Sequence, residues 1–251
     1  SSNAMIYSGI KPIFADIDSN TYNIDPKEIL KKINKKTQLI VPVHFAGQPC
    51  EMVEINNIAK KNKLKIIEDA AHAIGSKYSN GKMVGCCCYS DMTIFSFHPV
   101  KTITTGEGGM ITTNDKVLYE KLKLLRSHGI EKDPQRLKLY PGPWYYEMQI
   151  LGFNYRLTDL QSALGISQLA KLNKFIRLRS KIIEKYNFAF SKEKWLKIPF
   201  EKNKGLSVFH LYVLQIDFAT INKNRKQVME FLAKRGIGTQ VHYIPVYLQP
   251  F

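Results

Sequence analysis

The chain has 251 residues, enough for one large domain or for a large and a small one, and 44% of them are hydrophobic. No apolar run is long enough to span a bilayer and no export signal opens the chain, so we expect a soluble cytoplasmic protein without a membrane partner. The net charge of +16 raises the question of nucleic acid, but the lysines are spread along polar faces without interleaved aromatic residues, which disfavours that partner.

The first part of the chain alternates β-rich runs with helical stretches, which is the pattern of a mostly parallel sheet covered by helices. A helix is predicted to begin after Asp25, which serves as N-cap before Pro26. The side chain of Glu28 is expected to bond back to the backbone N–H of Asp25 and so complete a capping box. The spacing of apolar residues predicts a further helix through 52–59 and another at 116–126. Strands are predicted at 12–16, 39–43, 64–67, 92–97 and 106–113.

The second part begins with a proline-rich surface loop at 134–146, which we expect on a binding face. Thr158 and Gln161 form a capping box at the start of a long helix that links two domains. Beyond it a strand at 209–216, a helix at 222–235 and a strand at 238–244 predict a β-α-β unit. We therefore expect a large domain at 1–157, a linking helix at 158–190 and a small domain at 191–251.

Four cysteines are present, namely Cys50 and the run Cys86, Cys87 and Cys88. Adjacent residues of an extended segment point to opposite faces, which suits neither a zinc site nor a disulfide framework. We expect these thiols to be reduced and structural, and we expect no metal site.

Three polar side chains follow predicted strands: Asp69, Ser96 and Lys101. The carboxyl ends of parallel strands open into one crevice, so these residues could converge there. An acid, a hydroxyl and a lysine fit a pyridoxal 5'-phosphate site, because a lysine amine forms a Schiff base with the aldehyde and a carboxylate keeps the pyridine nitrogen protonated. Taken singly, the aspartate is more often a helix cap and the lysine a solvated side chain.

The order of three motifs is more specific than any one residue. Glu-Asp-Ala-Ala-His at 68–72, Ser-Phe-His-Pro-Val-Lys at 96–101 and Thr-Gly-Glu-Gly-Gly at 105–109 resemble the DegT/StrS-type sugar-nucleotide aminotransferases. The likeness continues through 126–129, 151–161 and 240–245. It implies an aspartate-aminotransferase-like α/β large domain of fold type I, with a mostly parallel sheet, and a smaller C-terminal α+β domain.

The resemblance also implies roles for five residues. Lys101 is the catalytic Schiff-base lysine, Asp69 pairs with the pyridinium nitrogen, and His72 lies beside the cofactor ring near its phenolic oxygen. Ser96 holds the phosphate, and Asn154 reaches the phosphate bound by the neighbouring subunit. A homodimer with shared active sites is therefore expected.

Within the family, the chain is most similar to the branch that serves pseudaminic acid synthesis. That likeness implies a UDP-linked 4-keto-6-deoxy-hexose as amino acceptor and L-glutamate as donor, in amino-sugar and surface-glycan biosynthesis. The sugar nucleotide would contact Ser96 and Asn154 and the segment Gln240, Val241, His242 and Tyr243. His242 and Tyr243 are equally well explained as ordinary strand residues. Some relatives carry histidine in place of the lysine and remove a hydroxyl, so Lys101 favours transamination.

Relatives extend beyond both ends of this sequence, so we expect a chain truncated at both ends. The absent N-terminal segment would include a helix that binds the cofactor phosphate and an aromatic residue that stacks on the ring. The opening Ser1 to Met5 fits a tag remnant, but also the family pattern, and native sequence is expected. The alternative function is a non-catalytic member of the fold that only binds ligand or dimerises. A third hypothesis, a nucleic-acid binder, rests on the net charge alone.

Overall fold

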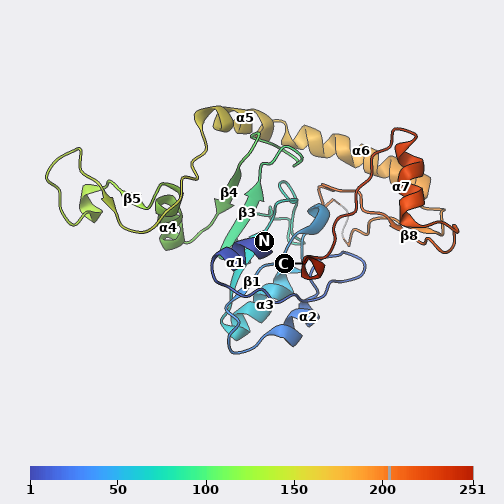
Figure 1. The fold of residues 1–251 in the computed structure, drawn as a ribbon, viewed down its shortest axis with the longest axis horizontal. Coiled ribbons are helices and arrows are strands. Elements are labelled where there is room, and N and C mark those ends of the chain that lie inside the picture. Colours follow the sequence, from blue (N-terminus) through green and yellow to red (C-terminus); the bar gives the residue numbers. More distant parts are fainter. Residues whose placement is uncertain (203–204, 251) are drawn as a thin grey trace.

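A four-stranded sheet forms the centre of this computed structural model, which describes residues 1–202 and 205–250 (Figure 1). The strands lie in the order β1 (Leu39–Ile40), β2 (Lys65–Asp69), β3 (Met92–Ser96) and β4 (Gly109–Thr112). The first three run parallel and β4 pairs antiparallel with β3. The mostly parallel sheet predicted from the sequence is confirmed, although β1 is shorter than the predicted strand at 39–43.

The first helices bear out part of the sequence prediction. The carboxylate of Asp25 caps α2 (Pro26–Lys32) by accepting the Lys27 N–H at 2.8 Å. Glu28 does not complete the predicted capping box, because the Asp25 N–H donates to the carbonyl of Asp16 at 3.0 Å and Glu28 pairs with Lys31 instead. Residues 12–16 form no strand, so the strand predicted there is wrong.

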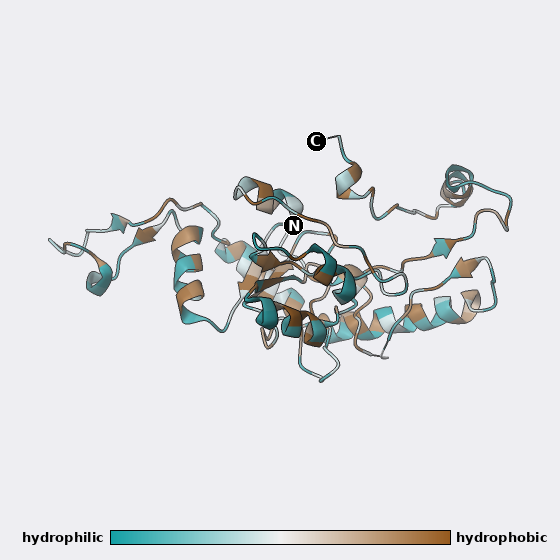
Figure 2. Ribbon diagram, turned by 90° about the horizontal axis from the view of Figure 1, so that it is seen from below, coloured by the Kyte–Doolittle hydropathy of each residue, from teal (hydrophilic) through white to brown (hydrophobic). Residues whose placement is uncertain are grey.

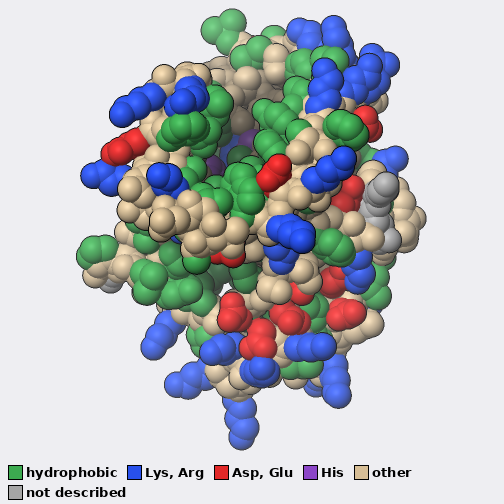
Figure 3. Space-filling model, turned by 90° about the vertical axis from the view of Figure 1, so that its right-hand side faces the viewer, with side chains coloured by type: hydrophobic (Ala, Val, Ile, Leu, Met, Phe, Trp, Pro, Cys, Tyr) green, Lys and Arg blue, Asp and Glu red, His purple; other side chains and the backbone are tan. Residues whose placement is uncertain are grey.

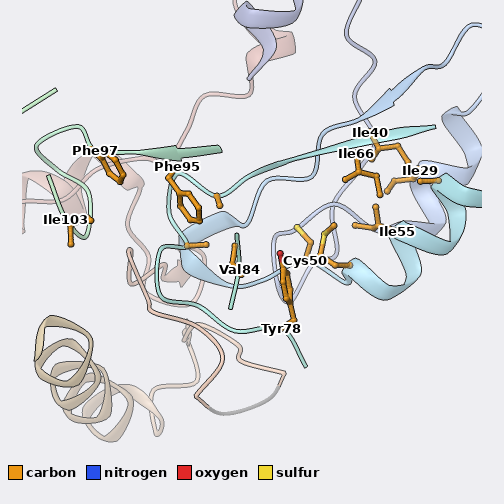
Figure 4. Packing of buried hydrophobic residues seen from close by; sticks show 14 residues of the cluster. Ile29, Ile40, Cys50, Ile55, Ile66, Tyr78, Val84, Phe95, Phe97 and Ile103 are labelled. Carbon is orange, nitrogen blue, oxygen red and sulfur yellow. The ribbon is translucent and has the colours of Figure 1, made fainter. Parts of the chain in front are cut away.

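The core lies between this sheet and α3 (Met52–Asn62), which buries Met52, Ile55 and Ala59 as its apolar spacing predicts. Figure 4 shows Ile55 beside Ile66 of β2, and the core continuing to Phe95 and beyond. Ile55 is fully buried, so truncating it would leave a cavity in a close-packed interior. This packing holds the three parallel strands, and therefore their carboxyl ends, in fixed positions.

An arm extends from the sheet on the side of β4 (Figures 1 and 2). It contains α4 (Lys116–Arg126), the antiparallel pair β5 (Ile130–Glu131) and β6 (Glu147–Met148), and the 3-10 turn η2 (Pro134–Arg136). The surface loop predicted at 134–146 is the connection between β5 and β6 and contains η2, while its place on a binding face stays a prediction. The arm exposes large apolar side chains: Trp144, Met148, Leu151, Phe153 and Tyr155.

Two consecutive helices take the place of the single linking helix expected at 158–190. They are α5 (Asp159–Leu169) and α6 (Leu172–Phe190), separated at Ala170 and Lys171. The predicted capping box at the start of α5 is confirmed, with the Gln161 N–H 3.2 Å from Oγ1 of Thr158 and the Thr158 N–H 3.0 Å from Oε1 of Gln161. Within residues 1–202 and 205–250, no helix combines the length and apolar character needed to cross a membrane.

The C-terminal part has less regular structure than predicted. It contains the antiparallel pair β7 (Leu196–Lys197) and β8 (Gln215–Ile216), and α7 (Arg225–Ala233), which Asn224 caps. The predicted strand at 209–216 is reduced to β8. The predicted strand at 238–244 is extended chain without a ladder, because among the described residues no strand lies beside it. Short helical turns complete the fold: α1 (Ser2–Tyr7), η1 (Phe45–Gly47) and η3 (Val246–Leu248). The division into domains stays a prediction.

Candidate active site

Asp69 and Ser96 leave the sheet at the same edge, because they are the last residues of the parallel strands β2 and β3. The backbone of Asp69 is fixed on both sides, with its N–H 2.9 Å from the carbonyl of Pro42 and its carbonyl accepting the His44 N–H at 3.0 Å. Its carboxylate accepts the Ala71 N–H at 3.1 Å and the hydroxyl of Ser1. The convergence of strand ends expected from the sequence is therefore present for these two residues.

Lys101 lies in a tight loop that follows β3. Its N–H donates to the carbonyl of His98 at 2.9 Å, and the next two residues, Thr102 and Ile103, are buried. The amine is half-buried. Burial lowers the pKa of Lys101, and the negative charge of Asp69 opposes this shift. The amine is therefore neutral more often than that of an exposed lysine, while still within the field of a carboxylate.

His72 follows Asp69 by three residues and is buried. Its Nδ1 accepts the Ala46 N–H at 3.3 Å, so the proton of the neutral ring lies on Nε2. Burial, followed by the positive charge of Lys101, lowers the pKa of His72 to about 4, while Asp69 acts in the opposite direction. At neutral pH this side chain is an uncharged N–H donor beside the lysine.

A second histidine, which the sequence did not assign to the site, lies against His72. The ring centroids of His72 and His210 are 4.4 Å apart at an interplanar angle of 34°. Burial, followed by the charge of His72, lowers the pKa of His210 to about 3. Figure 3 shows histidine side chains at the bottom of a hollow in the molecular surface. The stretch His210-Leu211-Tyr212 is the sequence signal that could have pointed to it.

The segment predicted to contact the substrate returns to this region in part. Burial, followed by the negative charge of Asp69, raises the pKa of Tyr243. The charge of His242 lowers the pKa values of both His72 and His210. Gln240 and Val241 are exposed.

Ser96 and Asn154 occupy different surroundings. The hydroxyl of Ser96 accepts the His98 N–H at 3.4 Å, within the loop that carries Lys101. Asn154 is exposed at the base of the arm, where its backbone pairs with Ser127. No hydrogen bond of its side chain joins it to the Lys101 loop within the described part of the chain. Its role across a subunit interface stays a prediction.

A buried polar cluster stands directly behind Asp69, and sequence reasoning missed it. Glu68 and His44 are both fully buried, with Nε2 of His44 2.8 Å from Oε2 of Glu68. Tyr78 donates to the same oxygen at 2.6 Å, while Ser90 and Thr93 donate to Oε1. Burial would raise the pKa of Glu68, but the hydrogen bonds from His44, Ser90 and Tyr78 lower it below its ordinary value. The sequence signal for this cluster is a glutamate, Glu68, two residues after Ile66 on the same buried face of β2.

The comparisons with known proteins agree with this arrangement. The model of the DegT/DnrJ/EryC1/StrS aminotransferase family matches residues 1–251. The chain is 43% identical over 249 residues to the UDP-4-amino-4,6-dideoxy-N-acetyl-beta-L-altrosamine transaminase of Campylobacter jejuni subsp. jejuni, covering 98% of this chain and 63% of that protein. It is 40% identical over 251 residues to the spore coat polysaccharide biosynthesis protein SpsC of Bacillus subtilis, covering 100% of this chain and 64% of that protein.

Among solved structures, the fold is similar to that of Helicobacter pylori PseC, an aminotransferase involved in the biosynthesis of pseudoaminic acid. The TM-score is 0.89 at 38% identity, with 99% of this chain and 64% of that chain covered. The chain thus spans a little under two thirds of the length of these relatives. With a family match over its whole length, the chain belongs to the DegT/DnrJ/EryC1/StrS aminotransferase family.

Proposed function

We propose that this chain carries the catalytic lysine of a pyridoxal 5'-phosphate-dependent aminotransferase that acts on a keto sugar nucleotide. The observation that carries the proposal is the half-buried amine of Lys101, whose pKa is lowered by burial within the field of Asp69. A neutral amine is the nucleophilic form of lysine, and a nearby carboxylate is the partner that a protonated pyridine nitrogen requires.

The residues present fit the cofactor. When bound, pyridoxal 5'-phosphate supplies an aldehyde that reacts with an amine and a pyridine ring that withdraws electrons. Asp69 would hold the proton of the pyridine nitrogen, and the Nε2–H of His72 would donate to an oxygen at the ring edge without adding a charge. The Ser96 hydroxyl would donate to the phosphate. Lys101, once released by the substrate, would move a proton, because its lowered pKa suits both accepting and returning it.

The substrate class is proposed from the relatives. The Campylobacter protein is named for a UDP-linked amino sugar, which supports a UDP-4-keto-6-deoxy-hexose as amino acceptor, with L-glutamate as donor. We propose that the segment from Gln240 to Tyr243 contacts that sugar nucleotide; the influence of His242 on the pKa of His72 and of Asp69 on the pKa of Tyr243 supports this. A homodimer in which Asn154 reaches the partner's site is part of the same proposal, and amino-sugar synthesis for a surface glycan in the cytoplasm is the role it serves.

The first test is the absorbance of the purified chain with pyridoxal 5'-phosphate. We expect a visible band in the wild type and in Lys60→Ala, which removes an exposed lysine on α3, and no band in Lys101→Ala. An unchanged band in Lys101→Ala would overturn the assignment of the lysine.

The second test is glutamate-dependent amination of a UDP-linked 4-keto-6-deoxy-hexose, followed by the mass of the sugar nucleotide. An aminated product supports the transaminase. The alternative function is a non-catalytic member of the fold that only binds ligand or dimerises. That alternative predicts cofactor binding or self-association with no aminated product.

A further inference from the structure

The ring of His72 has two other rings as neighbours. His210 is one of them, with centroids 4.4 Å apart. Phe45 is the other neighbour, with centroids 6.2 Å apart at an interplanar angle of 56°. The edge of the ring that carries Nδ1 is occupied by the Ala46 N–H. The position of His72 is therefore defined by its neighbours on several sides, and His210 is the nearest of the rings.

The backbone holds His210 against the turn that carries His72. Gly47 separates the two, and a Cβ built on it would lie 3.1 Å from the backbone nitrogen of His210 and 3.1 Å from the carbonyl oxygen of His72. Its φ of +96° also disfavours any side chain. The segment that carries His210 is also held in place. Val208 is buried, and the N–H of Phe209 donates to Oγ of Ser207 at 3.0 Å. The approach of His210 to His72 is thus built into both segments.

Protonation is unfavourable for both His72 and His210, whose pKa values are lowered. Lys101 and His242 lower the pKa values of both histidines, Arg179 lowers that of His210, and the negative charge of Asp69 raises that of His72. Nδ1 of His210 is buried and has no hydrogen-bond partner among the described residues. A half-buried, uncharged ring whose Nδ1 makes no hydrogen bond to a described residue is suited to cover its neighbour.

We propose that His210 is a positioning residue for His72: it covers the ring, excludes water from it and keeps its Nε2–H directed into the site. This inference rests on the proposed function, because the Nε2–H matters only if a cofactor is bound beside it. The residue comes from the C-terminal half of the chain, so the contact also joins that half to the loop of the catalytic site.

The test is the titration of His72 by NMR on the full chain without cofactor, with its signal assigned by its loss in His72→Gln. We expect His210→Ala to raise the pKa of His72 by at least one unit, a tenfold change in the proton affinity, because water reaches the ring. His210→Phe keeps a ring in place and should leave the titration within half a unit of the wild type. Chemical-shift dispersion verifies that each variant is folded.

A second variant disturbs the contact between His72 and His210 without changing either ring. Gly47→Ala pushes the backbone of His210 away from His72, so we expect a rise of the His72 pKa in the same direction. An unchanged titration in both His210→Ala and Gly47→Ala would overturn the proposal. So would a rise in His210→Phe equal to that in His210→Ala, because the imidazole nitrogens rather than the ring cover would then be responsible.

The kinetic consequence separates this proposal from the proposed function. In an active enzyme, His210→Ala should lower kcat several-fold with little change in the KM for glutamate, and His210→Phe should retain most of kcat. If the wild type shows no amination, the proposed function fails, while the NMR titration still decides whether His210 controls His72.

Discussion

Arg179 of α6 donates a hydrogen bond from Nη1 to Oγ1 of Thr102 at 3.2 Å, one residue beyond Lys101. Burial lowers the pKa of this guanidinium. Other contacts link α5 to the same region: Nε2 of Gln161 donates to the carbonyl of Glu107 at 2.9 Å, and an added Cβ on Gly165 would lie 3.0 Å from the methyl group of Thr105. The conformation of the Lys101 loop therefore depends on α5 and α6.

Thr102→Val tests this support. The change keeps the shape of the side chain but leaves a half-buried guanidinium without its hydroxyl partner, so we expect the free energy of unfolding to fall by about 1–3 kcal/mol. Thr102→Ser keeps the hydroxyl and should cost less. Urea denaturation of both variants measures the difference, and a larger loss in Thr102→Ser than in Thr102→Val would mean that the methyl group of Thr102, rather than its hydrogen bond, is what matters.

The Glu68 cluster provides a second prediction. Glu68→Ala removes the acceptor of four donors from a fully buried position and should lower the free energy of unfolding by about 3–5 kcal/mol. Tyr78→Phe removes one donor and leaves the other three, so a loss of about 1–3 kcal/mol is expected. Thermal unfolding of the two variants distinguishes these outcomes. A loss for Glu68→Ala no larger than that for Tyr78→Phe would show that the cluster is not held together by the carboxylate.

Much of the sheet and its helices could be predicted because local signals agree with the tertiary structure there. The apolar spacing of α3 matches the face it buries, and the capping box at Thr158 forms as expected. The predictions failed where the outcome depends on distant partners. Residues 238–244 have strand-like composition, but a strand exists only when a neighbouring strand takes up its backbone hydrogen bonds.

The candidate site shows the same limit. Asp69 and Ser96 could be placed together, because parallel strands end at one edge of a sheet. His210 could not, since it is 138 positions beyond His72 and only the turn around Gly47 brings the two rings together. The contact of Arg179 with Thr102 could not be predicted either, because it depends on how α6 crosses the loop.

The arm gives a prediction that compares two glycines of similar conformation. Gly129 has φ of +70° and an added Cβ would lie 1.8 Å from the carbonyl oxygen of Ile150, whereas Gly236 has φ of +74° and open space around it. Gly236→Ala should cost about 1 kcal/mol, from backbone strain alone. Gly129→Ala must also displace the backbone at Ile150 and should cost clearly more. Urea denaturation measures both, and equal losses would show that the arm shifts freely at this point.

His72 and His210 make stability depend on pH in a predictable direction. The pKa values of about 4 for His72 and about 3 for His210 lie below the value of about 6.5 expected in the unfolded chain. Between these limits the unfolded chain binds protons that the folded chain excludes, so the free energy of unfolding is highest above pH 6.5 and falls as the pH drops towards 4. Each unit of pKa difference corresponds to about 1.4 kcal/mol at most, and partial exposure reduces it. Urea denaturation at pH 7, 6 and 5 measures the slope while most carboxylates stay ionised. The double variant His72→Phe with His210→Phe removes both groups and should flatten the slope; a slope equal to that of the wild type would place the acid sensitivity elsewhere in the chain.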